Sequence, residues 1–274
     1  KAFDALRGLL PAASLSNVGI YGTGQAYEAL LLRMRSHPLP ESRYYADLML
    51  RELRKVIPSF LERVDREDRG VVWSEYLQET REDTADVVAA LFPEGSIVDP
   101  SPTVRLVDFD PEGEVKLIAS MMYPHSTMSE DQLERRVAGM NHEDRMAVAR
   151  AYVGDRRNRR HKPGRALERP FYRFDVLVDY GAFRDLQRHR MLSMDWQNLS
   201  PHHGYISSPL VNAAGMGPVY EEAMERSAAL YDLLVDDFPD QASYAINLAY
   251  KIRFNMNINA RSAMHLIELR TTPQ

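Results

Sequence analysis

Two arginines flank a histidine at Arg188-His189-Arg190. This cluster is the part of the chain best suited to form a binding or catalytic site. Cationic groups placed this close together repel one another, so an anion bound against them would be stabilising. Arginine suits that role because its planar guanidinium grips phosphates and carboxylates through paired hydrogen bonds. The alternative is a solvated helix end with surface salt bridges, the usual state of charged runs. The residues alone leave both interpretations open.

A strand and a short helical turn must position this cluster. Apolar side chains alternate with mostly charged ones over 171–180, which predicts a strand with one apolar face. Residues 181–187 follow as a helical turn and deliver Arg188. A binding site at the end of a regular element is a common arrangement, because the element holds the side chains in place.

Most of the remaining chain has the apolar spacing of helices. This spacing predicts helices over 25–34, 41–64, 71–92, 113–122, 130–140, 143–152, 219–235, 244–254 and 260–270. Pro58 should kink or divide the second of them, and Asn259 is a favoured N-cap for the last. A second strand is predicted over 104–109. The proline-rich stretch 93–102 is the best candidate for a domain boundary.

Length and composition exclude several classes of protein. The 274 residues suggest one or two domains, and the net charge of −5 does not favour nucleic-acid binding. No cysteine is present, which excludes disulfides, thiolate metal sites and cysteine nucleophiles. The sequence has no run of about 18 apolar residues, so we expect no membrane span. It starts at Lys1 without a methionine or a signal-peptide pattern, which predicts a cytoplasmic protein and a piece of a longer polypeptide.

Two further polar features could bind a ligand. The basic run 156–162 could bind a nucleic acid or a cofactor phosphate, although an exposed loop without a ligand is the commoner explanation. The adjacent pair His202 and His203 could suggest a metal ion. Adjacent histidines point in different directions, and no HxxE or HxxxH spacing lies nearby, so no metal site is predicted.

Two separate motifs resemble the flavin-dependent thymidylate synthases, the ThyX family. The family signature RHRxxS matches residues 188–193, and a glutamate upstream of the preceding strand matches Glu168. The closing segment of the family, NxRSxxHFxxLR, is similar to residues 259–270. Both motifs occur in the family's order, and the resemblance covers roughly 103–274.

The resemblance implies an α+β fold with a central mixed or antiparallel sheet, long flanking helices and an additional helical N-terminal region. It implies FAD as cofactor and the reductive methylation of deoxyuridylate (dUMP) to thymidylate, with methylenetetrahydrofolate and NADPH as co-substrates. Arg188 and Arg270 would then act in catalysis and bind the nucleotide. The residues that the resemblance assigns to FAD are Glu168, His189, Arg190, Ser193, Asn259 and Arg261. The absence of cysteine fits, because the unrelated type of thymidylate synthase needs a cysteine nucleophile.

The chain departs from the family pattern at the nucleotide side of this site. Asp195 and Trp196 stand where the family has Asn-Glu, and a glutamine of the family is replaced by Asp185. Two later positions of the signature are Asn198 and Ser200, the second in place of an arginine. Losing arginines from a phosphate pocket removes charge-assisted hydrogen bonds worth roughly 1.5–3 kcal/mol each. A partly degenerate nucleotide site is therefore expected.

The first hundred residues resemble another part of the same family. The segment Leu6-Arg7-Gly8-Leu9-Leu10-Pro11 is similar to the family's ARxxLP segment, whose arginine corresponds to Ser243 in the second copy. Residues 32–37 are similar to the LR…H end of the family. We therefore predict that 1–95 is the C-terminal half of a first family domain and 103–274 a second, divergent one. Family members are homotetramers with shared sites, so a homo-oligomer is expected, as a dimer acting as a pseudo-tetramer, with Arg7 binding substrate.

Three functions remain open. The first is an FAD-dependent thymidylate synthase of tandem form, acting on dUMP or a related nucleotide. The second is a non-catalytic domain that keeps the fold and the assembly surfaces, with or without flavin. The third is a nucleic-acid-binding module that uses 156–165, which the acidic net charge disfavours.

Overall fold

The computed structural model describes residues 2–92 and 102–271, so most of the candidate boundary at 93–102 lies outside the described residues. The described residues form two compact units, each assembled from separated stretches of the chain. The first unit contains 2–12, 102–229 and 246–271, and the second contains 13–92 and 230–245. The division into family domains at 1–95 and 103–274 stays a prediction, because compact units and family repeats are different kinds of boundary.

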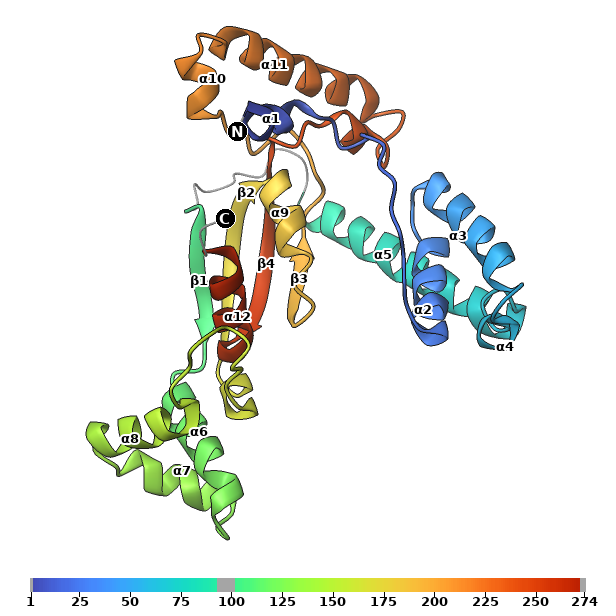
Figure 1. Cartoon of the computed structure of the whole chain (residues 1–274). Coiled ribbons are helices and arrows are strands. Elements are labelled where there is room, and N and C mark those ends of the chain that lie inside the picture. Colours follow the sequence, from blue (N-terminus) through green and yellow to red (C-terminus); the bar gives the residue numbers. More distant parts are fainter. Residues whose placement is uncertain (1, 93–101, 272–274) are drawn as a thin grey trace. The chain divides into compact units, whose positions relative to one another are not determined.

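A four-stranded antiparallel sheet organises the first unit (Figure 1). In sheet order its strands are β1 (Val104–Phe109), β2 (Phe171–Asp179), β4 (Lys251–Asn259) and β3 (Leu192–Trp196). The register pairs Phe171 with Asn259 and Leu192 with Ile258. The start of β2, the end of β4 and the start of β3 therefore lie side by side. The expected α+β class with an antiparallel sheet is confirmed.

The helix predicted over 244–254 is wrong. A short turn, η5 (Ala242–Ala245), is followed by the central strand β4. Ile252, Phe254 and Ile258 are buried on one side of that strand, at the even spacings that a strand requires. The buried run Ile246–Tyr250 ahead of it hid this alternation. A short apolar run buried on both sides cannot be told from a helix by periodicity alone.

Four helices of the first unit lie close to predicted positions: α6 (Gly113–Met122), α7 (Glu130–Ala138), α8 (His142–Val153) and α12 (Ala260–Arg270). Helix α9 (Tyr180–Leu186) corresponds to the predicted helical turn, whereas α1 (Ala2–Leu6) and α10 (Pro209–Ala213) were not predicted. Helix α11 (Gly217–Leu234) continues into the stretch assigned to the second unit. The predicted cap of α12 is confirmed, because the Asn259 side chain accepts a hydrogen bond from Ser262 N at 2.8 Å.

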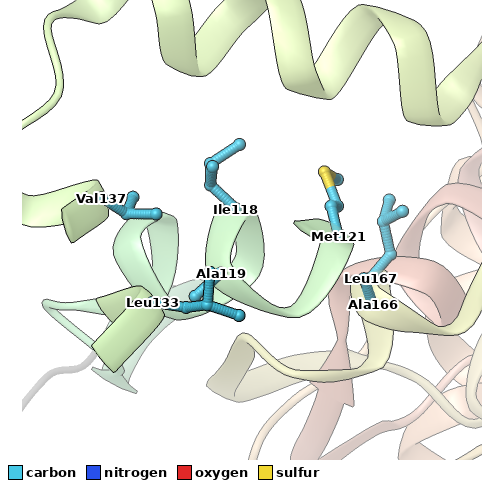
Figure 2. Close-up of a cluster of buried hydrophobic side chains, with 7 residues drawn as sticks. All are labelled: Ile118, Ala119, Met121, Leu133, Val137, Ala166 and Leu167. Carbon is cyan, nitrogen blue, oxygen red and sulfur yellow. The ribbon is translucent and has the colours of Figure 1, made fainter. Parts of the chain in front are cut away.

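One hydrophobic cluster joins helices α6 and α7 to the segment that precedes β2. Figure 2 shows its buried side chains, which are Ile118, Ala119, Met121, Leu133, Val137, Ala166 and Leu167. Ala166 and Leu167 belong to the short helix η4 (Arg165–Glu168). Burying two apolar residues of η4 anchors the turn that carries Glu168, because their removal from water stabilises that position.

The second unit is helical in its described residues. Its helices are α2 (Gly24–Arg35), α3 (Pro40–Leu53), α4 (Pro58–Leu61) and α5 (Val72–Leu91). Pro58 divides the helix predicted over 41–64, as expected, and stands at the first position of α4. A cluster of Leu31, Ala46, Leu50, Leu61 and Val64 forms the core. Among the described residues, no helix combines the length and the apolar character needed to cross a bilayer.

Candidate functional site

Helix α9 and strand β4 place the Arg188-His189-Arg190 cluster. Asp179, the last residue of β2, caps α9 through a hydrogen bond from Ala182 N at 2.9 Å. Phe183 of α9 is buried and packs on Phe254 of β4, with 4.9 Å between ring centroids. This contact ties α9 to the sheet. The chain then turns through the cluster and enters β3 beside the end of β4.

A cavity of about 640 Å³ gathers most of the predicted site residues. Its walls come from the segment before β2, the cluster after α9, and helix α12. The predicted residues that line it are Glu168, Arg188, His189, Arg190, Arg261 and Arg270. Ser193 and Asn259 line a separate cavity of about 380 Å³, whose walls also include Glu168 and Arg190. Residues more than 100 positions apart in the sequence, such as Glu168 and Arg270, therefore line one cavity.

An ion pair closes one wall of the larger cavity. Arg261 Nη1 donates to Glu168 Oε1 at 2.6 Å, and Arg261 Nε donates to the Pro163 carbonyl at 3.1 Å. Arg165 also binds Glu168 at 3.3 Å. The hydrogen bond from Arg261 is the main reason that the pKa of Glu168 lies below its ordinary value, and Arg165 adds to it. Glu168 is therefore ionised at neutral pH and holds the N-terminal turn of α12 against the loop before β2.

The basic run 156–162 lies in the wall of the same cavity, which the sequence did not reveal. Arg156, Arg159 and Lys162 all line it. Arg156 pairs with Glu268 of α12 at 2.6 Å, and this partner lowers the pKa of Glu268. The one feature of the sequence that could have linked the run to the cavity is its position shortly before Glu168. Spacing along a loop does not show which way the loop folds back, so the link required the tertiary structure.

A second polar network connects the cluster to the end of α12. Asp185 Oδ1 lies 3.1 Å from Arg188 Nη2, and the Asp185 carbonyl accepts a hydrogen bond from Arg270 Nη2 at 2.7 Å. Arg270 Nε donates to His189 Nε2 at 3.1 Å. His189 therefore presents an unprotonated Nε2 to a cation. Burial, then the charge of Arg270, then that of His265 lower the pKa of His189 below its ordinary 6.5.

Replacing Arg270 by glutamine is expected to raise the pKa of His189. The substitution removes a positive charge beside the ring, while burial of the ring persists, so the pKa should move only part of the way to 6.5. The folded state binds this proton less readily than the unfolded chain. The resulting stability is present above pH 6.5 and is lost as the pH falls through the lowered folded-state pKa.

Imidazole ¹⁵N and ¹H chemical shifts followed across a pH titration would measure this pKa. Arg226→Gln is the matched control, because Arg226 forms an exposed pair with Glu222 on α11. An unchanged or lower His189 pKa in Arg270→Gln, with the control equal to the parent protein, would contradict the predicted effect of Arg270.

Arg7 lines a different cavity, of about 790 Å³, together with Asp179 and Asp185. Its guanidinium binds Asp4 at 3.1 Å. Ser243, the residue at the corresponding position of the predicted second copy, lies in the second unit, where its hydroxyl donates to the Asp240 carbonyl at 3.4 Å. Arg7 is therefore not in the wall of the cavity that contains Arg188 and Arg270.

The two segments related by the proposed repeat pair with each other. Pro11 and Asn247, which occupy corresponding positions, form an antiparallel bridge. Ala12 N donates to Ile246 O at 2.8 Å, and Leu248 N donates to Leu10 O at 2.9 Å. The donors, Ala12 and Leu248, directly follow the two bridged residues, and the acceptors, Ile246 and Leu10, directly precede them. The local geometry is thus that of an antiparallel pair with a local two-fold axis.

The substituted positions after Ser193 lie on β3 and beyond it. Trp196 packs edge-on against Phe183 of α9, with 5.6 Å between centroids, and half of its surface is exposed. Trp196, Asn198 and Ser200 are absent from the walls of the three cavities given above. Among the described residues, no group of three or more histidines and carboxylates is arranged to hold a metal ion.

Residues 105–274 match the family model Thy1, described as thymidylate synthase complementing protein. The matched part is more than half of the chain, and the chain belongs to this family. Its sequence is 40% identical to a UPF0159 protein of Chlamydia pneumoniae over 276 residues, which covers all of this chain and 52% of the relative. A UPF0159 protein of Thermoplasma acidophilum is 30% identical, with 54% of its length covered. The chain thus spans about half the length of the curated relatives it matches.

Solved structures of low sequence identity also align with the chain. Flavin-dependent thymidylate synthase ThyX from Helicobacter pylori, complexed with FAD and dUMP, aligns with a TM-score of 0.43 at 20% identity, over 63% of this chain and 86% of that one. The UMP/dUMP methylase PolB from Streptomyces cacaoi, bound with 5-Br dUMP, gives a TM-score of 0.47 at 16% identity, over 60% of this chain and 76% of that one.

Proposed function

We propose that this chain is an FAD-binding member of its family that carries a partly altered nucleotide site. The observation that carries the proposal is the cavity of about 640 Å³ where Glu168, His189, Arg190 and Arg261 meet. Its volume lies within the roughly 300–1,000 Å³ typical of cofactor and small-molecule sites. Family membership supports the reaction class, the methylation of a uridylate.

The lining of this cavity fits a cofactor that carries phosphates. Arg159, Lys162 and Arg190 have no carboxylate partner within the described residues, so their charges are available to an anionic ligand. The apolar side chains of Met191, Leu192 and Met264 line the same space and suit a flat ring system. FAD, when bound, supplies the redox and one-carbon chemistry of the family, and the protein supplies binding, orientation and charge.

The residues around the cavity have distinct tasks in this proposal. Arg261 and Glu168 hold the loop before β2 against α12, which fixes the wall on which the cofactor lies. His189 and Arg190 contact the cofactor, with Ser193 and Asn259 in the adjoining cavity. Arg188 and Arg270 act in catalysis and orient the pyrimidine substrate. The neutral imidazole of His189 is suited to hydrogen bonding without adding a positive charge.

The paired segments around Pro11 and Asn247 support a tandem arrangement of two family domains, at 1–95 and 103–274. Under this arrangement a dimer of the chain acts as a pseudo-tetramer, and Arg7 contacts substrate in a site of the assembly. The co-substrates would be NADPH and methylenetetrahydrofolate. The alternative, a non-catalytic domain with a role in assembly, is favoured by the substitutions at Asp195, Trp196 and Ser200.

Absorbance spectroscopy of the purified protein tests the cofactor assignment. We expect a flavin spectrum, or uptake of added FAD in equal molar amount. Protein that stays colourless after incubation with excess FAD would refute the assignment. If FAD binds, an assay of methyl transfer to dUMP with methylenetetrahydrofolate and NADPH separates the two functions. Turnover supports a synthase, whereas flavin binding without turnover supports the assembly role.

A further inference from the structure

Asp185 presents its carboxylate and its carbonyl to both arginines of the proposed nucleotide site. Its Oδ1 lies 3.1 Å from Arg188 Nη2, and its Oδ2 lies 3.9 Å from Arg270 Nη1. The Asp185 carbonyl also accepts from Arg270 Nη2 at 2.7 Å. Arg188 follows Asp185 on the same turn of chain, whereas Arg270 reaches it from the end of α12. One residue thus supplies anionic and polar acceptors to two guanidiniums from separate elements.

A carboxylate and a phosphate compete for the same feature of arginine, the fork of N–H donors. A phosphate arriving at Arg188 and Arg270 would meet the negative charge of Asp185 at short range, and like charges repel. To bind the phosphate, the arginines would first have to break their ion pairs and hydrogen bond with Asp185. Other cations of the same cavity, Arg159 and Arg190, have no such carboxylate among the described residues.

We infer that Asp185, which lines the neighbouring cavity of about 790 Å³ and contacts Arg188 and Arg270 from there, determines specificity at these two arginines by standing in for the phosphate of a ligand. Arg188 and Arg270 then offer little net attraction to a phosphomonoester. A ligand whose end is uncharged and carries hydroxyl groups, such as a pyrimidine nucleoside, fits that electrostatic environment better. The inference rests on the proposed function in one respect, because it takes Arg188 and Arg270, at one end of the cofactor cavity, to be the pyrimidine site of the family.

Calorimetric titration with two probes, deoxyuridine and its 5′-monophosphate, isolates the contribution of the phosphate. In the parent protein the two probes are expected to bind with affinities equal within about threefold. In Asp185→Asn the monophosphate should bind about tenfold more tightly, equivalent to about 1.4 kcal/mol, and deoxyuridine should be unaffected. Asp131→Asn is the matched control, because Asp131 forms an exposed pair with Arg135 at 3.2 Å on α7.

Labelling with phenylglyoxal, which modifies guanidinium groups, gives a readout that needs no nucleotide. Arg188 should react faster in Asp185→Asn, and inorganic phosphate should protect it in that variant but not in the parent protein. Peptide mass spectrometry would quantify the label. Flavin uptake, recorded on the same samples, reports on the cofactor assignment separately.

The result that would overturn the inference is tight binding of the monophosphate to the parent protein, about a hundredfold above deoxyuridine. Monophosphate binding that is unchanged, weakened or absent in Asp185→Asn would also overturn it. In each of these cases a flavin spectrum would leave the proposed function standing. If the parent protein binds no flavin while phosphate protects Arg188 from phenylglyoxal in Asp185→Asn as expected, only the cofactor assignment is refuted.

Discussion

Replacing Arg261 by alanine is expected to weaken FAD binding by about a hundredfold, or about 2.7 kcal/mol. Arg261 makes two hydrogen bonds across the wall of the cavity, to Glu168 at 2.6 Å and to the Pro163 carbonyl at 3.1 Å. Hydrogen bonds to charged groups are worth about 1.5–3 kcal/mol, so removing these bonds accounts for the expected loss. The substitution also leaves the carboxylate of Glu168, which is three-quarters buried, without its strongest partner.

Fluorescence titration of the apoprotein with FAD would measure this loss. Arg261→Lys should fall between the parent protein and alanine, because lysine keeps the charge but cannot bind Glu168 and Pro163 together. Arg226→Ala is the control, since it removes an arginine from an exposed pair on α11. FAD affinity of Arg261→Ala within about threefold of the parent value would show that this ion pair does not shape the cofactor site.

Substituting Gly70 by alanine is expected to destabilise the second unit by about 3 kcal/mol or more. Gly70 is buried in the turn η2 (Glu67–Val71), and its N–H donates to the Arg63 carbonyl at 3.0 Å. A Cβ atom there would lie 2.1 Å from the Val64 carbonyl oxygen and 2.5 Å from that of Arg63. These are backbone atoms beside the core residue Val64, so relief requires moving the chain that leads into α5.

Trp73 provides a local probe for this prediction. The chain has two tryptophans, and in a Trp196→Phe background the remaining one, Trp73 on α5, reports on the second unit. Urea unfolding followed by its fluorescence should show a lower midpoint for Gly70→Ala. Gly19→Ala is the control, because a Cβ atom at Gly19 would meet nothing within 4 Å. Equal midpoints for the two variants would mean that the turn accommodates a side chain.

Particular elements show why much of the fold could be predicted from the sequence. The strand over 171–180 carries its own alternation, and the structure has β2 at Phe171–Asp179. The helix over 260–270 carries its own cap, Asn259, and its observed bounds are the same. Pro58 divides the predicted helix because proline lacks the backbone N–H that a helix interior needs. Each of these signals is local, because it depends on residues within one or two turns of chain.

The strand β4 was missed because its signal is not local. Its identity depends on pairing with β2 along one edge and β3 along the other, and the buried run Ile246–Tyr250 ahead of it hides the alternation. The basic run 156–162 was ambiguous for a related reason. Whether its charges face solvent or line a cavity is decided by how the loop packs on α12, a contact that spans about a hundred residues.

By itself the sequence determined the family motifs, the residue types of the site, and the local elements that carry them. These follow from side-chain chemistry and from short-range periodicity. Only the tertiary structure decided which of these residues share a cavity. It placed Arg188 and Arg270 against Asp185, put Arg7 in a different cavity, and joined Pro11 to Asn247. Such contacts depend on the packing of distant segments, because the free energy that holds them comes from burial and pairing that no single stretch contains.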